Sequence, residues 1–98
     1  MKYRYEEFTW PEIKEAVAGN RVAVLPVGTV EQHGPHLPLV TDVLTAGELS
    51  RRAVESMPDA AVLLPPVYYS FNEHHLDFPG TIAIPGDTII DYVTHIGV

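Results

Sequence analysis

Two nearly continuous apolar runs lie between segments in which apolar residues recur at helical spacing. The runs at residues 22–27 and 61–64 have the length and composition of strands covered on both faces, as in a parallel sheet. Helical periodicity marks residues 10–18, 43–57 and 86 onward. This alternation of helices and strands predicts the α/β fold class.

Local signals predict how the helices begin. Thr9 is expected to cap the first helix, and Glu12 to complete a capping box with it. The second helix is expected to begin with a cap at Thr41 or Asp42. Trp10 is expected to pack against the sheet.

A third, short strand is expected at residues 81–84. A sheet of about three strands would keep an uncovered edge and uncovered apolar faces. The 98 residues suffice for one small domain. We therefore expect this chain to be incomplete by itself: a fragment, or one part of a fold assembled from two chains or several copies.

The composition excludes several classes of partner and of chemistry. The formal net charge of −7 argues against binding to a nucleic-acid backbone. The absence of cysteine excludes disulfides and thiolate chemistry. No apolar segment is long enough to span a membrane, and the first residues do not resemble a signal peptide. A cytoplasmic location is the default expectation.

The loop at residues 31–42 concentrates groups that can bind a metal. Glu31 and His33 are two positions apart, so an extended backbone would point both to the same side. Asp42 follows at the start of a predicted helix, and one carboxylate can use both oxygens to bridge two cations. The alternative is that Glu31, His33 and His36 are ordinary polar loop residues bonded to the backbone.

The segment from Leu25 to Asp42 resembles the signature motif of the creatininase (creatinine amidohydrolase) family, and residues 78–82, Phe-Pro-Gly-Thr-Ile, are similar to its second motif. The resemblance implies a three-layer α/β/α sandwich with a mostly parallel sheet. It also implies hydrolysis of a C–N bond in a cyclic or linear amide, with water activated between two divalent metal ions (Zn, Mn or Fe). Glu31 would bind one ion, His33 the other, and Asp42 would bridge them.

The family's remaining ligands belong to a later motif containing Asn-Gly-His, which does not occur in these residues. The resemblance therefore implies that residues 1–98 are the N-terminal part of a single creatininase-like domain. A complementary C-terminal chain or segment, in a homo- or hetero-oligomer, would supply the catalytic residues and complete the site. This chain alone is expected to be inactive. The alternative is a non-catalytic assembly subunit, or a fragment, that retains half of the fold.

Three further residues are candidates near the site. His75 occupies the family's histidine position before the second motif, so it is expected to line the pocket of a small-molecule amide substrate or to hydrogen-bond the metal ligands; it could also only brace its loop. Tyr69 follows the second strand and could stack on a flat ring, or instead seal a subunit contact. His36 is expected to support the ligands rather than bind a metal. The sequence does not identify the substrate.

Overall fold

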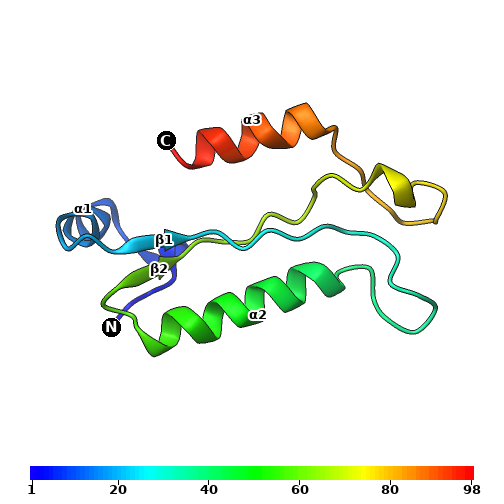
Figure 1. The fold of residues 1–98 in the computed structure, drawn as a ribbon. Coiled ribbons are helices and arrows are strands. Elements are labelled where there is room, and N and C mark those ends of the chain that lie inside the picture. Colours follow the sequence, from blue (N-terminus) through cyan, green and yellow to red (C-terminus); the bar gives the residue numbers. More distant parts are fainter.

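The computed structural model describes residues 1–98. It contains three α-helices, two short strands and two single turns of 3-10 helix (Figure 1). In chain order they are η1 (Tyr5–Glu7), α1 (Trp10–Ala18), β1 (Val22–Val24), α2 (Thr41–Ser56), β2 (Ala61–Leu63), η2 (Glu73–His75) and α3 (Gly86–Ile96). The predicted helices are present, and the arrangement is that of an incomplete α/β fold.

The two strands form a parallel sheet, as the apolar runs predicted. Val22 pairs with Ala61 and Val24 pairs with Leu63. Beyond the strands the chain segments continue side by side, and the amide of Gly28 donates to the carbonyl of Val67 at 2.9 Å. Figure 1 shows this extended pair running from the sheet to the far end of the molecule. The loops that follow β1 and β2 therefore meet at one end of the fold.

The predicted third strand is wrong, because residues 81–84 form no ladder. The amide of Ile82 donates to the carbonyl of Val30 at 3.1 Å, and that of Ile84 donates to the carbonyl of Ser70 at 3.0 Å. These two bonds reach two different segments, so no pairing register is established. The segment is nevertheless extended and ties the two long loops together.

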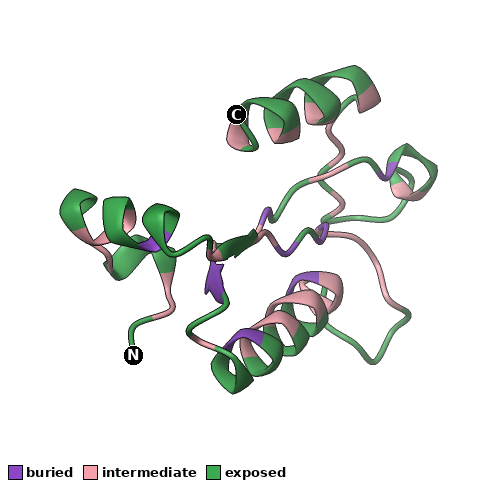
Figure 2. Cartoon of the chain, turned by 60° about the vertical axis from the view of Figure 1, so that its left-hand side comes forward, coloured by how far each residue is buried: buried purple, intermediate pink, exposed green.

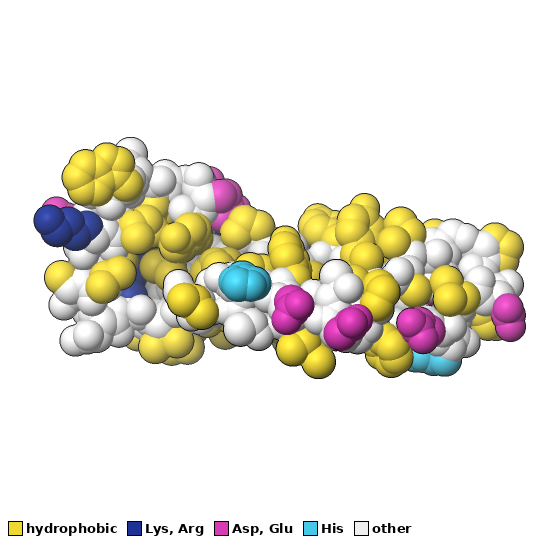
Figure 3. Space-filling view, turned by 90° about the horizontal axis from the view of Figure 1, so that it is seen from above, with side chains coloured by type: hydrophobic (Ala, Val, Ile, Leu, Met, Phe, Trp, Pro, Cys, Tyr) yellow, Lys and Arg dark blue, Asp and Glu magenta, His cyan; other side chains and the backbone are white.

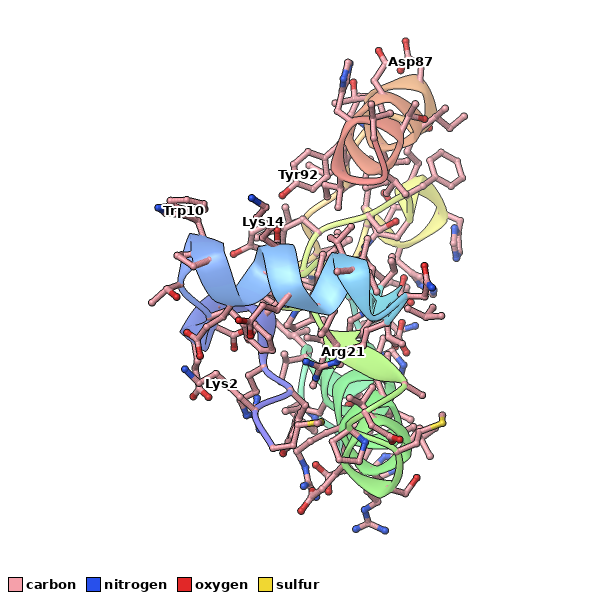
Figure 4. The ribbon with its side chains drawn as sticks, turned by 90° about the vertical axis from the view of Figure 1, so that its left-hand side faces the viewer. Lys2, Trp10, Lys14, Arg21, Asp87 and Tyr92 are labelled. Carbon is pink, nitrogen blue, oxygen red and sulfur yellow. The ribbon has the colours of Figure 1, made fainter.

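Helix α1 begins as predicted, with the amide of Thr9 donating to Glu12 Oε1 at 2.9 Å. This bond and the ammonium group of Lys2 lower the pKa of Glu12 to about 2. The expectation for Trp10 is wrong, since 78% of its surface is exposed and it projects outward from α1 (Figure 4). Ala16 is the buried residue of α1. It lies six positions after Trp10, which corresponds to about 240° of rotation around a helix, so the two side chains lie on different faces of α1.

Helix α2 packs against the sheet and contributes Val43 and Val54 to the buried hydrophobic residues. Val54 is fully buried and clusters with Ala61 and Leu63. The N-cap position of α2 is Val40, so neither Thr41 nor Asp42 caps this helix as predicted. Asp42 instead lies within the first turn of α2.

Much of the remaining apolar surface is uncovered. Only 11 of 98 residues are buried, and Val22 of β1 is 63% exposed, so β1 is not covered on both faces as expected. The accessible surface is 6565 Å², about 1,000 Å² more than the roughly 5,500 Å² of a compact monomer of this mass. The radius of gyration is 15.5 Å, against about 13 Å for a compact domain of this length.

Helix α3 lies on the side of the extended segments opposite to α2 (Figures 1 and 2). It has no buried residue. Seen from that side, hydrophobic side chains cover much of the surface of the molecule, and acidic groups are interspersed among them (Figure 3). No helix is both long and apolar enough to cross a membrane.

Candidate metal centre

The site is formed where the loop after β1 returns to the first turn of α2. The amide of Glu31 donates to the carbonyl of Leu39 at 3.1 Å. His33 and Leu37 form an isolated antiparallel bridge. The loop is therefore folded back on itself, which places Glu31 and His33 beside the residues that open α2.

Gly28 fixes the distance between this loop and α2. A Cβ atom at Gly28 would lie 2.6 Å from the amide nitrogen of Val43 and 2.7 Å from its Cα. Only glycine allows the backbones to approach this closely. Val43 directly follows Asp42, so this contact sets the position of the Asp42 carboxylate relative to the loop.

Glu31, His33 and Asp42 converge. Their ligand atoms all lie within 4.8 Å of one another, and His33 Nε2 is 2.9 Å from Asp42 Oδ1. The Glu31 side chain is only 13% exposed, and its Oε2 atom is buried without a hydrogen-bond partner. The structure thus brings together the three residues predicted as metal ligands.

The orientation of His33 suits a ligand. Its Nδ1 atom lies 3.4 Å from the carbonyl oxygen of Glu31, which leaves Nε2 directed at Asp42. The bond to the Glu31 carbonyl is the main cause of a raised pKa of His33, and the negative charge of Asp42 adds to it, while partial burial acts in the opposite direction. A proton and a metal ion would therefore compete for the position between His33 and Asp42.

The donor set fits a divalent cation. Two carboxylates and one imidazole are ligands that Zn²⁺ and Mn²⁺ accept in enzymes. The Glu31 side chain is only 13% exposed, and a carboxylate withdrawn from water is costly unless a cation or a hydrogen-bond donor compensates its charge. The location of Asp42 in the first turn of α2 also favours its negative charge.

A buried polar pair, Thr29 and Asn72, joins the two long loops. Asn72 is fully buried, and its amide group donates to Thr29 Oγ1 at 2.9 Å and to the carbonyl of Val30 at 3.2 Å. Neither residue is recognisable from the sequence alone, because isolated Thr and Asn residues in loops give no distinctive signal. Their bonds hold the η2 loop against the segment that leads to Glu31.

His75 is carried to the site by η2. Its Nε2 atom lies 3.5 Å from Glu31 Oε2, and its Nδ1 atom lies 3.2 Å from the side-chain nitrogen Nε2 of Gln32. A second group with ligand atoms within 4.8 Å of one another consists of Glu31, His74 and His75. The structure therefore places His75 against the candidate ligand Glu31.

The other two candidate residues lie elsewhere. His36 is exposed in the loop and belongs to neither group of potential ligands. Tyr69 lines a hollow of about 390 Å³ together with Ile89 and Tyr92 of α3. The hollow beside Asp42, about 440 Å³ in volume, is bordered instead by Phe71, which follows the same strand.

The chain is similar in sequence to proteins of known function. The profile of the creatininase family, described as creatinine amidohydrolase, matches residues 6–98. The chain belongs to the creatininase family. It is 34% identical over 96 residues to the creatinine amidohydrolase of Pseudomonas putida, covering 92% of this chain and 36% of that protein. It is 43% identical over 67 residues to the mycofactocin precursor peptide peptidase of Mycolicibacterium smegmatis, covering 64% of this chain and 27% of that protein.

Solved structures of the family share the fold. A Zn–Zn form of a mutant creatininase matches with a TM-score of 0.87 and 32% identity, over 98% of this chain and 39% of that one. A creatininase with Mn matches with a TM-score of 0.87 and 31% identity, over the same shares. The predicted family and fold are confirmed, and the chain spans less than half the length of these creatininases.

Proposed function

We propose that this chain carries part of the active site of a divalent-metal-dependent amidohydrolase, which cleaves a C–N bond in a cyclic or linear amide. The observation that carries the proposal is the convergence of Glu31, His33 and Asp42, with ligand atoms within 4.8 Å of one another. Membership of the creatininase family and the Zn and Mn forms of its solved structures support it.

In this proposal Glu31 would hold one divalent ion and His33 a second, and Asp42 would be shared between them. Such a pair of ions would supply Lewis-acid activation of water and of the amide carbonyl. The chain itself fixes the ligands: Gly28 sets the position of Asp42, and the Glu31 carbonyl orients the His33 ring. The hollow beside Asp42, with Phe71 at its border, offers a place for a small amide.

We further propose that a complementary polypeptide completes the site and covers the exposed apolar face. Two observations support this. The chain spans 39% of the length of the solved creatininases. Its accessible surface of 6565 Å² exceeds that of a compact monomer by about 1,000 Å². Residues 1–98 alone are expected to show no appreciable turnover, because an incomplete set of ligands binds metal weakly.

The test uses the protein purified from its native host together with any chain bound to it. We expect Zn or Mn in the purified protein and hydrolysis of creatinine or of a short peptide, lost with a chelator and restored by either metal. Asp42→Asn should lose the metal and reduce the rate by about 100-fold or more. Asp91 is an exposed carboxylate on α3, and Asp91→Asn should leave both the metal content and the rate unchanged.

Two outcomes would contradict the proposal. Hydrolysis by a metal-free protein would exclude the metal-dependent mechanism. Full metal content and activity in Asp42→Asn would show that this residue is not a ligand. A native assembly that remains fully active and metal-free with Asp42→Asn would instead support a non-catalytic assembly subunit.

A further inference from the structure

The orientation of the Gln32 side chain is fixed by the backbone. The amide of Gly34 donates to Gln32 Oε1 at 2.9 Å. An amide nitrogen cannot accept this bond, so the oxygen of Gln32 must face Gly34. The NH₂ group of Gln32 then points in the other direction, where His75 Nδ1 lies 3.2 Å away.

This orientation of Gln32 determines which ring nitrogen of His75 carries the proton. A proton on Nδ1 would set an N–H against the NH₂ group of Gln32. The Nδ1 atom of His75 must therefore accept the hydrogen bond, and a neutral ring then carries its proton on Nε2. His75 Nε2 is the atom that faces Glu31 Oε2, at 3.5 Å.

Glu31 needs such a donor. Its Oε2 atom is buried and has no hydrogen-bond partner in the present geometry. A distance of 3.5 Å is too long for a good N–H···O bond, which closes at about 2.9 Å. A movement of about 0.6 Å would therefore form the bond and hold the carboxylate.

We propose that His75 is a positioning residue for the metal ligand Glu31, and that Gln32 sets His75 as the donor. The chain of contacts runs from the Gly34 amide through Gln32 and His75 to Glu31 Oε2. By holding Oε2, His75 directs the other carboxylate oxygen toward the ion. The inference rests on the proposed function for its effect on metal binding, but not for the protonation state of His75.

The same geometry argues against a second cation site at Glu31, His74 and His75. Their ligand atoms lie within 4.8 Å of one another, but His75 presents an N–H rather than a lone pair to Glu31. His74 is exposed, and its ring centroid lies 4.2 Å from that of His75, but His74 makes no hydrogen bond to Gln32, His75 or Glu31. A His74 variant therefore tests whether the ring contact alone, without the hydrogen bonds, affects metal binding.

The first experiment determines the protonation of His75 directly. The native protein is labelled with ¹⁵N-histidine, and ring nitrogens are observed by solid-state NMR at about pH 8, where a neutral imidazole normally predominates. His75→Gln identifies the signals of His75 by removing them. We expect an unprotonated Nδ1 and a protonated Nε2. A proton on Nδ1 would overturn the proposal. Gln32→Glu should place a proton on Nδ1, because a carboxylate at residue 32 accepts a hydrogen bond there and has no N–H to donate.

The second experiment measures Zn²⁺ affinity by competition with a chelator. His75→Leu should weaken binding by about 10–100-fold, as expected for loss of a group that supports a ligand. His75→Gln, which keeps an N–H donor, and the control His74→Gln should each stay within about threefold. Unchanged affinity in His75→Leu would refute the positioning role, and equal losses in the two His75 variants would identify His75 as a ligand. Absence of any Zn²⁺ binding would refute the proposed function, while the NMR result would still decide the proton position.

Discussion

Gly28→Ala should weaken metal binding without touching any ligand. The new Cβ would lie 2.6 Å from the amide nitrogen of Val43, whereas ordinary contacts begin at 3.4 Å. The neighbouring atoms are backbone, so they cannot rotate away, and the first turn of α2 must move by about 0.8 Å. Asp42 precedes Val43 and moves with it. A misplacement of about 1 Å in a preorganised site costs up to about 100-fold, so we expect Zn²⁺ affinity to fall by roughly 10–100-fold.

The assay is chelator competition with the native protein and its Gly28→Ala variant. Gly47→Ala is the matched control, because a Cβ at Gly47 meets nothing within 4 Å and Gly47 lies on the same helix. This control should bind Zn²⁺ as the parent does and gain about 0.5–1 kcal/mol of stability, since alanine favours helix over glycine. Parental affinity in a folded Gly28→Ala variant would refute the reasoning that links this close contact to the position of Asp42.

Three further predictions concern the scaffold, all measured on the native protein. Asn72→Ala should lower the free energy of unfolding in urea by about 1–3 kcal/mol, because Thr29 Oγ1 loses its buried donor; no change would show that the pair does not hold the loops. Val54→Ala should cost about 2–3 kcal/mol, from two lost methyl groups and a cavity at a fully buried position; a cost below about 0.5 kcal/mol would mean that this core is not formed. The pKa of Glu12 is lowered from 4.5 to about 2, so its stabilising effect is complete above about pH 4.5 and is lost as the pH falls toward 2. Glu12→Gln should remove this part of the pH dependence in thermal unfolding, and an unchanged profile would contradict the role of the capping box.

The sequence pattern predicted the elements whose signals are local. The capping box of Thr9 and Glu12 and the two apolar runs correspond to α1 and to the parallel pair β1 and β2. The sequence pattern could not predict that Trp10 is exposed, because it does not reveal which face of the first helix packs against the rest of the chain. Residues 81–84 have the composition of a strand but bond to two different segments, and composition does not reveal a partner.

The candidate ligands could be named from the sequence, but the residues that hold them in position could not. Glu31, His33 and Asp42 lie within one loop and the start of the next helix, and family resemblance assigned a role to each, so all three could be identified before their geometry was known. Asn72 and the contact of Gly28 with Val43 join segments distant in the chain. Their importance depends on close approaches between the two loops and between Gly28 and helix α2, and no spacing in the sequence encodes those approaches.

The most direct test of the metal centre is anomalous X-ray diffraction from crystals of the native protein, recorded on both sides of the Zn and Mn absorption edges. We expect anomalous peaks for two cations, one bound by Glu31, the other by His33, and both by Asp42, with Zn–ligand distances of about 2.0–2.2 Å. Metal at another position only, or Glu31, His33 and Asp42 facing apart with no cation between them, would contradict the proposed metal centre.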